Sequence, residues 1–71
     1  MNVTYSRHAR IRMAQRSISE EEVEAVLDDY HTSYTDLKGN PVYVGRPSGR
    51  HIKVVVRRAS NPPHVITLFE Q

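Results

Sequence analysis

The spacing of apolar residues changes from a helical to a strand-like period near the middle of the chain. A helix over residues 20–29 is predicted by an apolar face at i, i+3, i+4 and i+7: Val23, Val26, Leu27 and Tyr30. Ser19 and Glu22 have the spacing of a capping box that opens this helix. After His31, short apolar runs are separated by Gly and Pro, which is typical of strands and turns.

Another helix, the first in chain order, is predicted for residues 5–16, with Thr4 or Ser6 as its N-cap. Its apolar face is thin, because we expect Ala9 and Met13 to pack on one side and Ile11 on another. Beside Ala9 and Met13 lies a stripe at i, i+4 and i+8, formed by His8, Arg12 and Arg16.

Strands are predicted for residues 31–36, 42–46, 50–58 and 64–69, joined by short turns. In the third of these, Ile52, Val54 and Val56 alternate with Lys53, Val55 and Arg57, so the two sets face opposite sides of a sheet. We therefore expect an α+β fold in one domain over residues 1–71. Two N-terminal helices pack on one face of a three- to four-stranded antiparallel sheet. The other face is expected to present Lys53, Arg57 and Tyr43.

Composition excludes several classes of protein. The chain has no Cys, which rules out disulfides and thiolate zinc sites and fits a cytoplasmic location. No apolar run approaches a membrane span, so no membrane partner is expected. His8, His31, His51 and His64 lack the spacing of a helical zinc site, so neither a metal nor another cofactor is expected.

Charge is distributed unevenly along the chain. Seven of the eight acidic residues lie between Glu20 and Asp36, whereas four Arg precede that stretch and six Lys or Arg follow it. This segregation suggests an anionic partner, although clustered charge is also the ordinary character of a solvated face. For a nucleic acid partner, the candidate binding residues are Arg12, Arg16, Tyr43, Arg50, Lys53 and Arg57.

The same residues allow a hypothesis of metal-independent RNA cleavage, in which the 2′-hydroxyl attacks the adjacent phosphate. The reaction needs proton-transfer groups and cations that stabilise the charge on the phosphate. The candidate catalytic residues are His8, Arg12, Arg16 and Lys53, and His64 and Tyr43 are further candidates for proton transfer.

A longer pattern resembles a small bacterial and archaeal family of unknown function, which is similar in fold to the RelE and ParE toxins of toxin–antitoxin systems. The resemblance rests on His8-Ala9-x-x-Arg12-Met13-x-x-Arg16-x-Ile18-Ser19, an acidic second helix, and the runs 52–56 and 65–67. It implies a curved antiparallel sheet with a basic face that meets RNA on the ribosome, and an antitoxin protein as partner. The implied roles fall on Arg12, Arg16, Lys53 and Arg57, with His8 for proton transfer. Unlike longer toxins, this chain is expected to have no strand before its first helix.

Two alternatives stay open. The chain is a non-catalytic interaction module if its uncovered sheet face, with Val55 and Ile66 or Leu68, forms a homodimer or holds a partner protein. The Arg stripe is instead structural if Arg12 and Arg16 clamp the two helices together.

Overall fold

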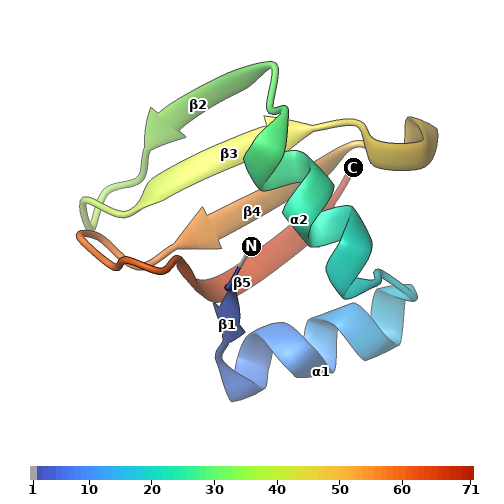
Figure 1. Ribbon diagram of the computed structural model, residues 1–71, viewed down its shortest axis with the longest axis horizontal. Coiled ribbons are helices and arrows are strands. Elements are labelled where there is room, and N and C mark those ends of the chain that lie inside the picture. The colour runs from blue at the N-terminus through green and yellow to red at the C-terminus, as the bar shows by residue number, and fades with distance from the viewer. Residues whose placement is uncertain (1) are drawn as a thin grey trace.

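The computed structural model describes residues 2–71 as an α+β fold, with two helices packed on a five-stranded mixed sheet (Figure 1). The strand order is β1-β5-β4-β3-β2, in which β1 is parallel to β5 and all other neighbours are antiparallel. In chain order the elements are β1 (Thr4–Tyr5), α1 (Arg7–Arg16), α2 (Glu20–Asp28), β2 (Thr32–Thr35), β3 (Pro41–Gly45), the 3-10 turn η1 (Pro47–Gly49), β4 (Ile52–Val56) and β5 (His64–Glu70).

The α+β class and the two N-terminal helices are confirmed, but the expectation of three or four purely antiparallel strands was wrong. A strand does precede the first helix: β1 lies parallel to β5, Thr4 N–H donates to the Pro63 carbonyl at 3.0 Å, and Ser6 N–H donates to the Val65 carbonyl at 2.9 Å. Two residues are too few to show an alternating pattern, so β1 has no signature in the sequence.

Helix α1 begins at the N-cap Ser6, whose hydroxyl accepts a hydrogen bond from Ala9 N–H at 3.0 Å. It ends at Ser17, which adopts the left-handed conformation at φ 54°. Ala9 and Met13 are buried as predicted. Ile11 does not pack on a second side; it is 46% exposed.

Helix α2 has the predicted capping box, because Ser19 Oγ accepts from Glu22 N–H and the Glu22 carboxylate accepts from Ser19 N–H. Val23 and Val26 are fully buried, but Tyr30 lies beyond the helix end and is 44% exposed. Ridges of α2 approach the sheet closely at Gly45, where an added Cβ would lie 3.3 Å from the Cα atom of Val26.

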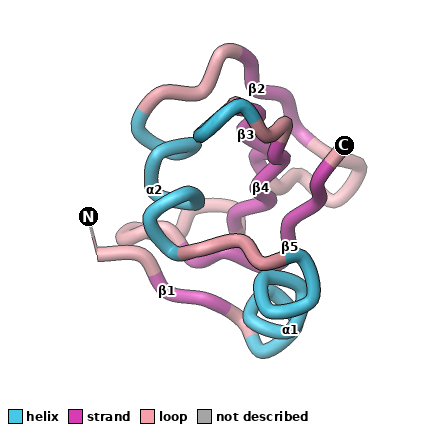
Figure 2. The backbone as a smooth tube through the Cα atoms, turned by 90° about the vertical axis from the view of Figure 1, so that its right-hand side faces the viewer, coloured by secondary structure: helices cyan, strands magenta, loops and turns pink. Residues whose placement is uncertain are grey.

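The core lies between the helices and one face of the sheet. Helix α2 crosses β3 and β4, while α1 runs beside β5 (Figures 1 and 2). Ile52, Val54 and Val56 face this core as predicted, and Val65 and Leu68 of β5 join them across an irregular register between Val55 and Val56. Among residues 2–71, no helix packs on the opposite face of the sheet.

Among residues 2–71, neither α1 nor α2 is long and apolar enough to cross a membrane, because α1 has 10 residues and α2 has 9.

Candidate nucleic-acid interface

We call the helix-free side of the sheet the open face. The strand register defines its two rows of side chains, which are Tyr34–Val42–Val55–Thr67 and Thr32–Val44–Lys53–Phe69. Val42, Val44 and Val55 are 3%, 3% and 7% exposed, so their neighbours already cover most of their apolar surface. Tyr34 and Phe69, by contrast, are 48% and 42% exposed. Aromatic rings, rather than aliphatic side chains, are what the open face offers to a ligand.

Each exposed ring of the open face has a cation beside it. The Lys53 ammonium lies 5.9 Å from the centroid of the Tyr34 ring, and the Arg12 guanidinium lies 5.1 Å from that of Phe69. Because Lys53 pairs with Phe69 across β4 and β5, the order over the face is Tyr34, Lys53, Phe69, Arg12. Alternating rings and cations can stack bases and contact phosphates together.

A groove of about 430 Å³ runs along the open face between the β2–β3 hairpin and β5. Tyr34 and Phe69 line it, and Val42, Val55 and Thr67 form its floor. At the hairpin tip Leu37 is fully exposed, and Lys38 follows it on the rim. The groove is therefore lined mainly by apolar and aromatic side chains, and its charged residues are Asp36 and Lys38.

The Arg12 side chain extends from α1 along β5 to the Phe69 ring on the open face, and on the way its Nε donates to the Leu68 carbonyl at 3.3 Å. Two residues earlier in β5, the Ile66 carbonyl accepts a hydrogen bond from the Ser6 hydroxyl. His8 lies one helical turn before Arg12 and is exposed. Its side chain makes no hydrogen bond or ion pair with any other residue in the described range 2–71.

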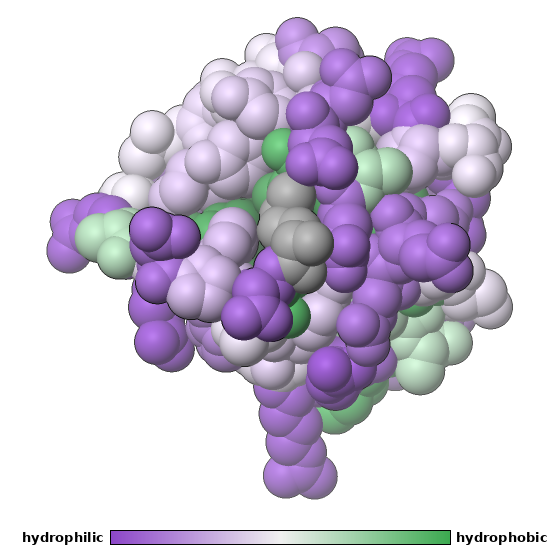
Figure 3. Space-filling model, viewed as in Figure 1, coloured by the Kyte–Doolittle hydropathy of each residue, from purple (hydrophilic) through white to green (hydrophobic). Residues whose placement is uncertain are grey.

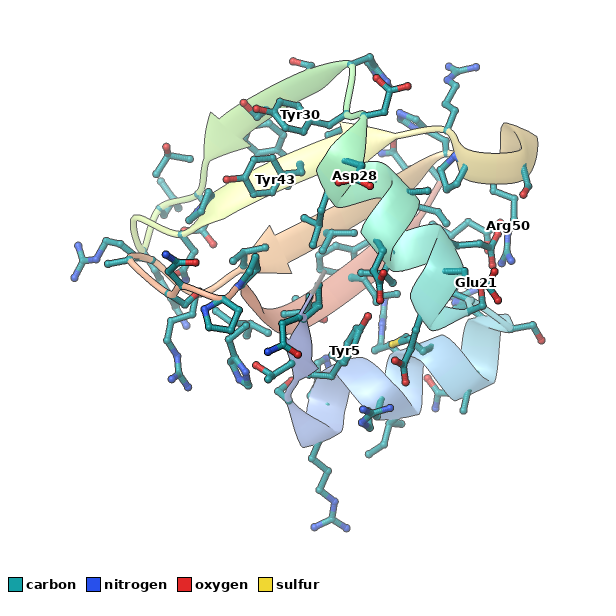
Figure 4. All side chains as sticks on the ribbon, viewed as in Figure 1. Tyr5, Glu21, Asp28, Tyr30, Tyr43 and Arg50 are labelled. Carbon is teal, nitrogen blue, oxygen red and sulfur yellow. The ribbon has the colours of Figure 1, made fainter. Side chains whose placement is uncertain are left out.

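Arg50, a predicted nucleic-acid-binding residue, lies inside a network of intramolecular contacts. Its Nε and Nη2 atoms donate to the two oxygens of Glu70 at 3.0 and 2.9 Å. Nη1 donates to Glu22 at 3.2 Å and to the Ser17 carbonyl at 2.8 Å, and Nη2 also reaches the Arg16 carbonyl at 2.6 Å. Figure 4 shows Arg50 beside the start of α2, away from the open face. The guanidinium joins the end of α1, the start of α2 and the end of β5.

Tyr43 lies on the helix side of the sheet, which corrects its predicted place on the open face. Its register partner is the buried Val54, and its ring lies 4.8 Å from that of Tyr30, as Figure 4 shows beside α2. The strand begins at Pro41, one residue earlier than predicted. The face on which Tyr43 lies was predicted wrongly for another reason: it depends on which residue of the neighbouring strand pairs with Tyr43, and no local pattern in the sequence determines that pairing. Arg57 lines a small pocket next to Tyr43, so these two predicted residues come together away from Lys53.

The remaining predicted residues are spread over the surface. Arg16 is the last residue of α1 and its side chain is exposed, two turns from His8. His64 Nδ1 lies 2.8 Å from the Thr4 hydroxyl at the β1–β5 junction. The rings of His31 and His51 stack at 5.8 Å between centroids. Within residues 2–71, no group of His, Asp and Glu side chains has the arrangement of a metal site.

Tyr5 is a further titratable group between the two helices (Figure 4). Burial, followed by the nearby carboxylates of Glu20 and Glu24, raises its pKa to about 12, against the opposing effect of Arg10. The phenol therefore stays protonated at neutral pH. Arg10, whose guanidinium lies 4.9 Å from the Tyr5 ring and 3.1 Å from Glu20, is held on the helix side.

Two members of the open face were missed by the sequence-based choice of site residues. Tyr34 and Phe69 are absent from the candidate binding and catalytic residues, although both lie in predicted strands. The sequence does contain a signal for Tyr34. The strand Thr32–Thr35 has no aliphatic side chain, so Tyr34 is its one large apolar residue and is a candidate for an exposed ring. Phe69 has none, because only the register with Lys53 shows which face it occupies.

The hydrophilic surface in Figure 3 belongs to the helix side, where acidic residues of α2 gather.

Comparison with protein families gives a match over residues 5–70 to a family described as "Domain of unknown function (DUF4258)". The chain belongs to this family. No curated protein and no solved structure matches it. Membership in the DUF4258 family carries no activity with it, so any function has to be argued from the open face.

Proposed function

We propose that this DUF4258 protein is RNA-directed and binds single-stranded RNA on its open face. The observation that supports this best is the order Tyr34, Lys53, Phe69, Arg12, in which each exposed ring lies within 6 Å of a cation. Single-stranded nucleic acids are held by rings that stack on bases and by cations that follow the phosphates. The proposed site keeps Arg12 and Lys53 from the predicted set and adds Tyr34 and Phe69.

The proposal extends to a RelE-like role, including metal-independent cleavage of RNA on the ribosome by a toxin paired with an antitoxin. The support for this is the architecture of two helices on one face of a five-stranded sheet and the position of His8 one turn from Arg12 on α1. In this scheme His8 transfers a proton, while Arg12 and Lys53 stabilise the charge that develops on the scissile phosphate.

The alternative of a non-catalytic interaction module has less support on this face. Its motive was exposed aliphatic surface, but Val55 is 7% exposed and Leu68 lies in the core on the helix side, which leaves Ile66, a half-buried residue that lines the groove. What favours it is Leu37, which is fully exposed at the margin of the groove. A protein partner that binds there competes with RNA for Tyr34, so RNA binding discriminates between the two functions.

The test is fluorescence anisotropy with a labelled single-stranded RNA at several salt concentrations. Lys53→Ala and Arg12→Ala each remove one phosphate contact, and we expect each to weaken binding about tenfold at low salt and to lower the slope of log affinity against log salt by about 1. Arg10→Ala is the matched control, since it removes an Arg of the same helix that pairs with Glu20 on the other side. Equal affinities for wild type and all three variants contradict the proposal.

Cleavage is measured on the same RNA with and without ribosomes. We expect wild-type protein to produce cuts and His8→Ala to reduce their rate at least about 100-fold, the usual contribution of a general acid or base, with RNA affinity unchanged. Absence of cuts by wild type, or equal cutting by His8→Ala, removes the catalytic part and leaves the binding part.

A further inference from the structure

The groove on the open face carries a carboxylate among its polar groups. Asp36, Lys38 and Asn40 of the β2–β3 hairpin line this groove together with the rings of Tyr34 and Phe69. The charges beside those two rings are cations, whereas a carboxylate repels the phosphates of a nucleic acid. Asp36 therefore lowers the affinity of the face for an anion, unless its charge is matched by a hydrogen-bond donor of the ligand.

The hairpin holds the Asp36 carboxylate in one orientation. Its Oδ1 atom accepts hydrogen bonds from Lys38 N–H at 2.9 Å and from Asn40 N–H at 2.8 Å. Within residues 2–71, the Oδ2 atom takes part in no hydrogen bond and no ion pair. The turn thus uses one oxygen of the carboxylate and leaves the other to a ligand.

The side-chain amide of Asn40 is oriented by a similar bond. Its Oδ1 atom accepts a hydrogen bond from Arg58 N–H at 3.1 Å, so its Nδ2 group points elsewhere. Nδ2 donates to no acceptor among residues 2–71. The hairpin therefore offers one carboxylate oxygen and one amide donor, on two residues that line the same groove.

Tyr34 supplies a stacking surface in this groove. Its ring is exposed, and the Lys53 ammonium lies 5.9 Å from the ring centroid. Single-stranded bases stack on such rings and are then recognised through hydrogen bonds to their edges. A base on Tyr34 lies in the groove that Asp36 and Asn40 also line, so its edge can meet their free atoms.

These free atoms discriminate among the four bases. A carboxylate oxygen has two lone-pair sites and only accepts hydrogen bonds. Guanine has two neighbouring donors, N1–H and N2–H, followed by the acceptor O6. Adenine and cytosine offer one amino group beside an acceptor nitrogen, and uracil offers one N–H between two carbonyls. Guanine is therefore the base that gives Asp36 Oδ2 two donors and gives Asn40 Nδ2 an acceptor.

We propose that the open face prefers guanine in single-stranded RNA and that Asp36 determines this preference. The inference rests on the proposed RNA binding and names the base that the groove accepts. Asp36 Oδ2 accepts from N1–H and N2–H, Asn40 Nδ2 donates to O6, and the guanine ring stacks on Tyr34. With any other base the charge of Asp36 stays less well paired, and binding is weaker.

The test uses four labelled uridine hexamers in which one central position is guanine, adenine, cytosine or uracil. Their affinities are measured by fluorescence anisotropy at one low salt concentration. We expect wild-type protein to bind the guanine hexamer at least about tenfold more tightly than each of the others, which is the discrimination typical of a bidentate contact to a base.

Asp36→Asn isolates the free oxygen. The Asn Oδ1 atom can keep both hydrogen bonds from the backbone, which forces the new NH₂ group into the place of Oδ2, where it faces the donors of guanine. We expect affinity for the guanine hexamer to fall about tenfold and affinity for the other three to rise, because a negative charge is removed. If Asp36 only stabilises the turn, the substitution raises all four affinities alike.

Glu21→Gln is the matched control, since it removes an exposed carboxylate from α2 and should leave the ranking of the hexamers unchanged. Four equal wild-type affinities overturn the proposal, as does an Asp36→Asn protein that keeps the full guanine preference while its NMR spectrum shows a folded hairpin. In both cases RNA binding by the open face stands if Lys53→Ala weakens the binding of all four hexamers. If no hexamer binds at low salt, the proposed RNA binding fails and the guanine preference fails with it.

Discussion

At the scale of single residues, Arg50 shows how the structure redistributes the cations of the sequence. Its side chain is 26% exposed and contacts Glu70, Glu22 and the carbonyls that end α1. These partners lie 20 to 34 residues away in the chain, so their convergence on one guanidinium depends on the tertiary fold. An Arg beside a strand indicates positive charge, but only the fold decides whether that charge is available to a ligand.

The Arg50–Glu70 pair predicts acid sensitivity. Hydrogen bonds from Arg50 hold the pKa of Glu70 below its ordinary value of 4.5, so the carboxylate stabilises the folded state fully above that value. That contribution is lost as the pH falls through the lower pKa of the folded protein. In urea unfolding from about pH 6 to 3, Glu70→Gln should therefore lose less of its stability than wild type does.

Glu21→Gln provides the control, because Glu21 is an exposed carboxylate of α2 with no ion pair among residues 2–71. Its pH dependence should follow that of wild type. If Glu70→Gln and wild type lose stability in parallel, the Arg50–Glu70 pair contributes nothing, and Arg50 is held by Glu22 and the backbone carbonyls.

At the scale of elements, the position of α2 on the sheet depends on a missing side chain. Gly45 of β3 lies directly under Val26, with 3.3 Å between its would-be Cβ atom and the Cα atom of Val26. The backbone of β3 at this point does not require Gly for its conformation, because its φ is not positive. Gly is required by the close approach of the helix instead.

We therefore predict that Gly45→Val destabilises the protein by about 1–3 kcal/mol, the usual cost of overpacking, since the new side chain must displace α2. Thermal and urea unfolding measure the change. Ser33→Val, on the exposed edge strand, adds a similar side chain without a packed helix above it and should leave stability nearly unchanged. A Gly45→Val protein as stable as wild type would show that α2 can shift freely.

The elements that could be predicted are those with local determinants. The capping box at Ser19 and the alternation of Ile52, Val54 and Val56 each lie within a few residues, and both are confirmed. The strand β1 and the facing of Tyr43 depend on pairing with distant segments, at His64 and Val54 respectively. A shift of one residue in pairing exchanges the faces of a strand, so such errors place single residues on the wrong side without changing the fold class.

At the scale of the whole molecule, charge separates across the sheet. The acids of α2 lie on the helix side, whereas Arg12 and Lys53 flank the rings of the open face. The separation is partial, because Arg10 and Arg50 pair with acids of α2, Arg57 lies beside Tyr43, and Asp36 lines the groove of the open face. Arg12 and Lys53 lie at the open face, as the sequence predicts. Tyr43 and Arg50 do not, because the facing of Tyr43 depends on strand pairing and the position of Arg50 depends on ion pairs with distant residues, neither of which the sequence shows.

The most direct test of the central claim is a two-dimensional NMR titration of the isotopically labelled protein with a short single-stranded RNA. Binding on the open face predicts that the largest shift changes map to Tyr34, Lys53 and Phe69, and that they diminish as salt is raised. Changes confined to the helix side, around Tyr30 and Tyr43, or no changes at low salt, would contradict it.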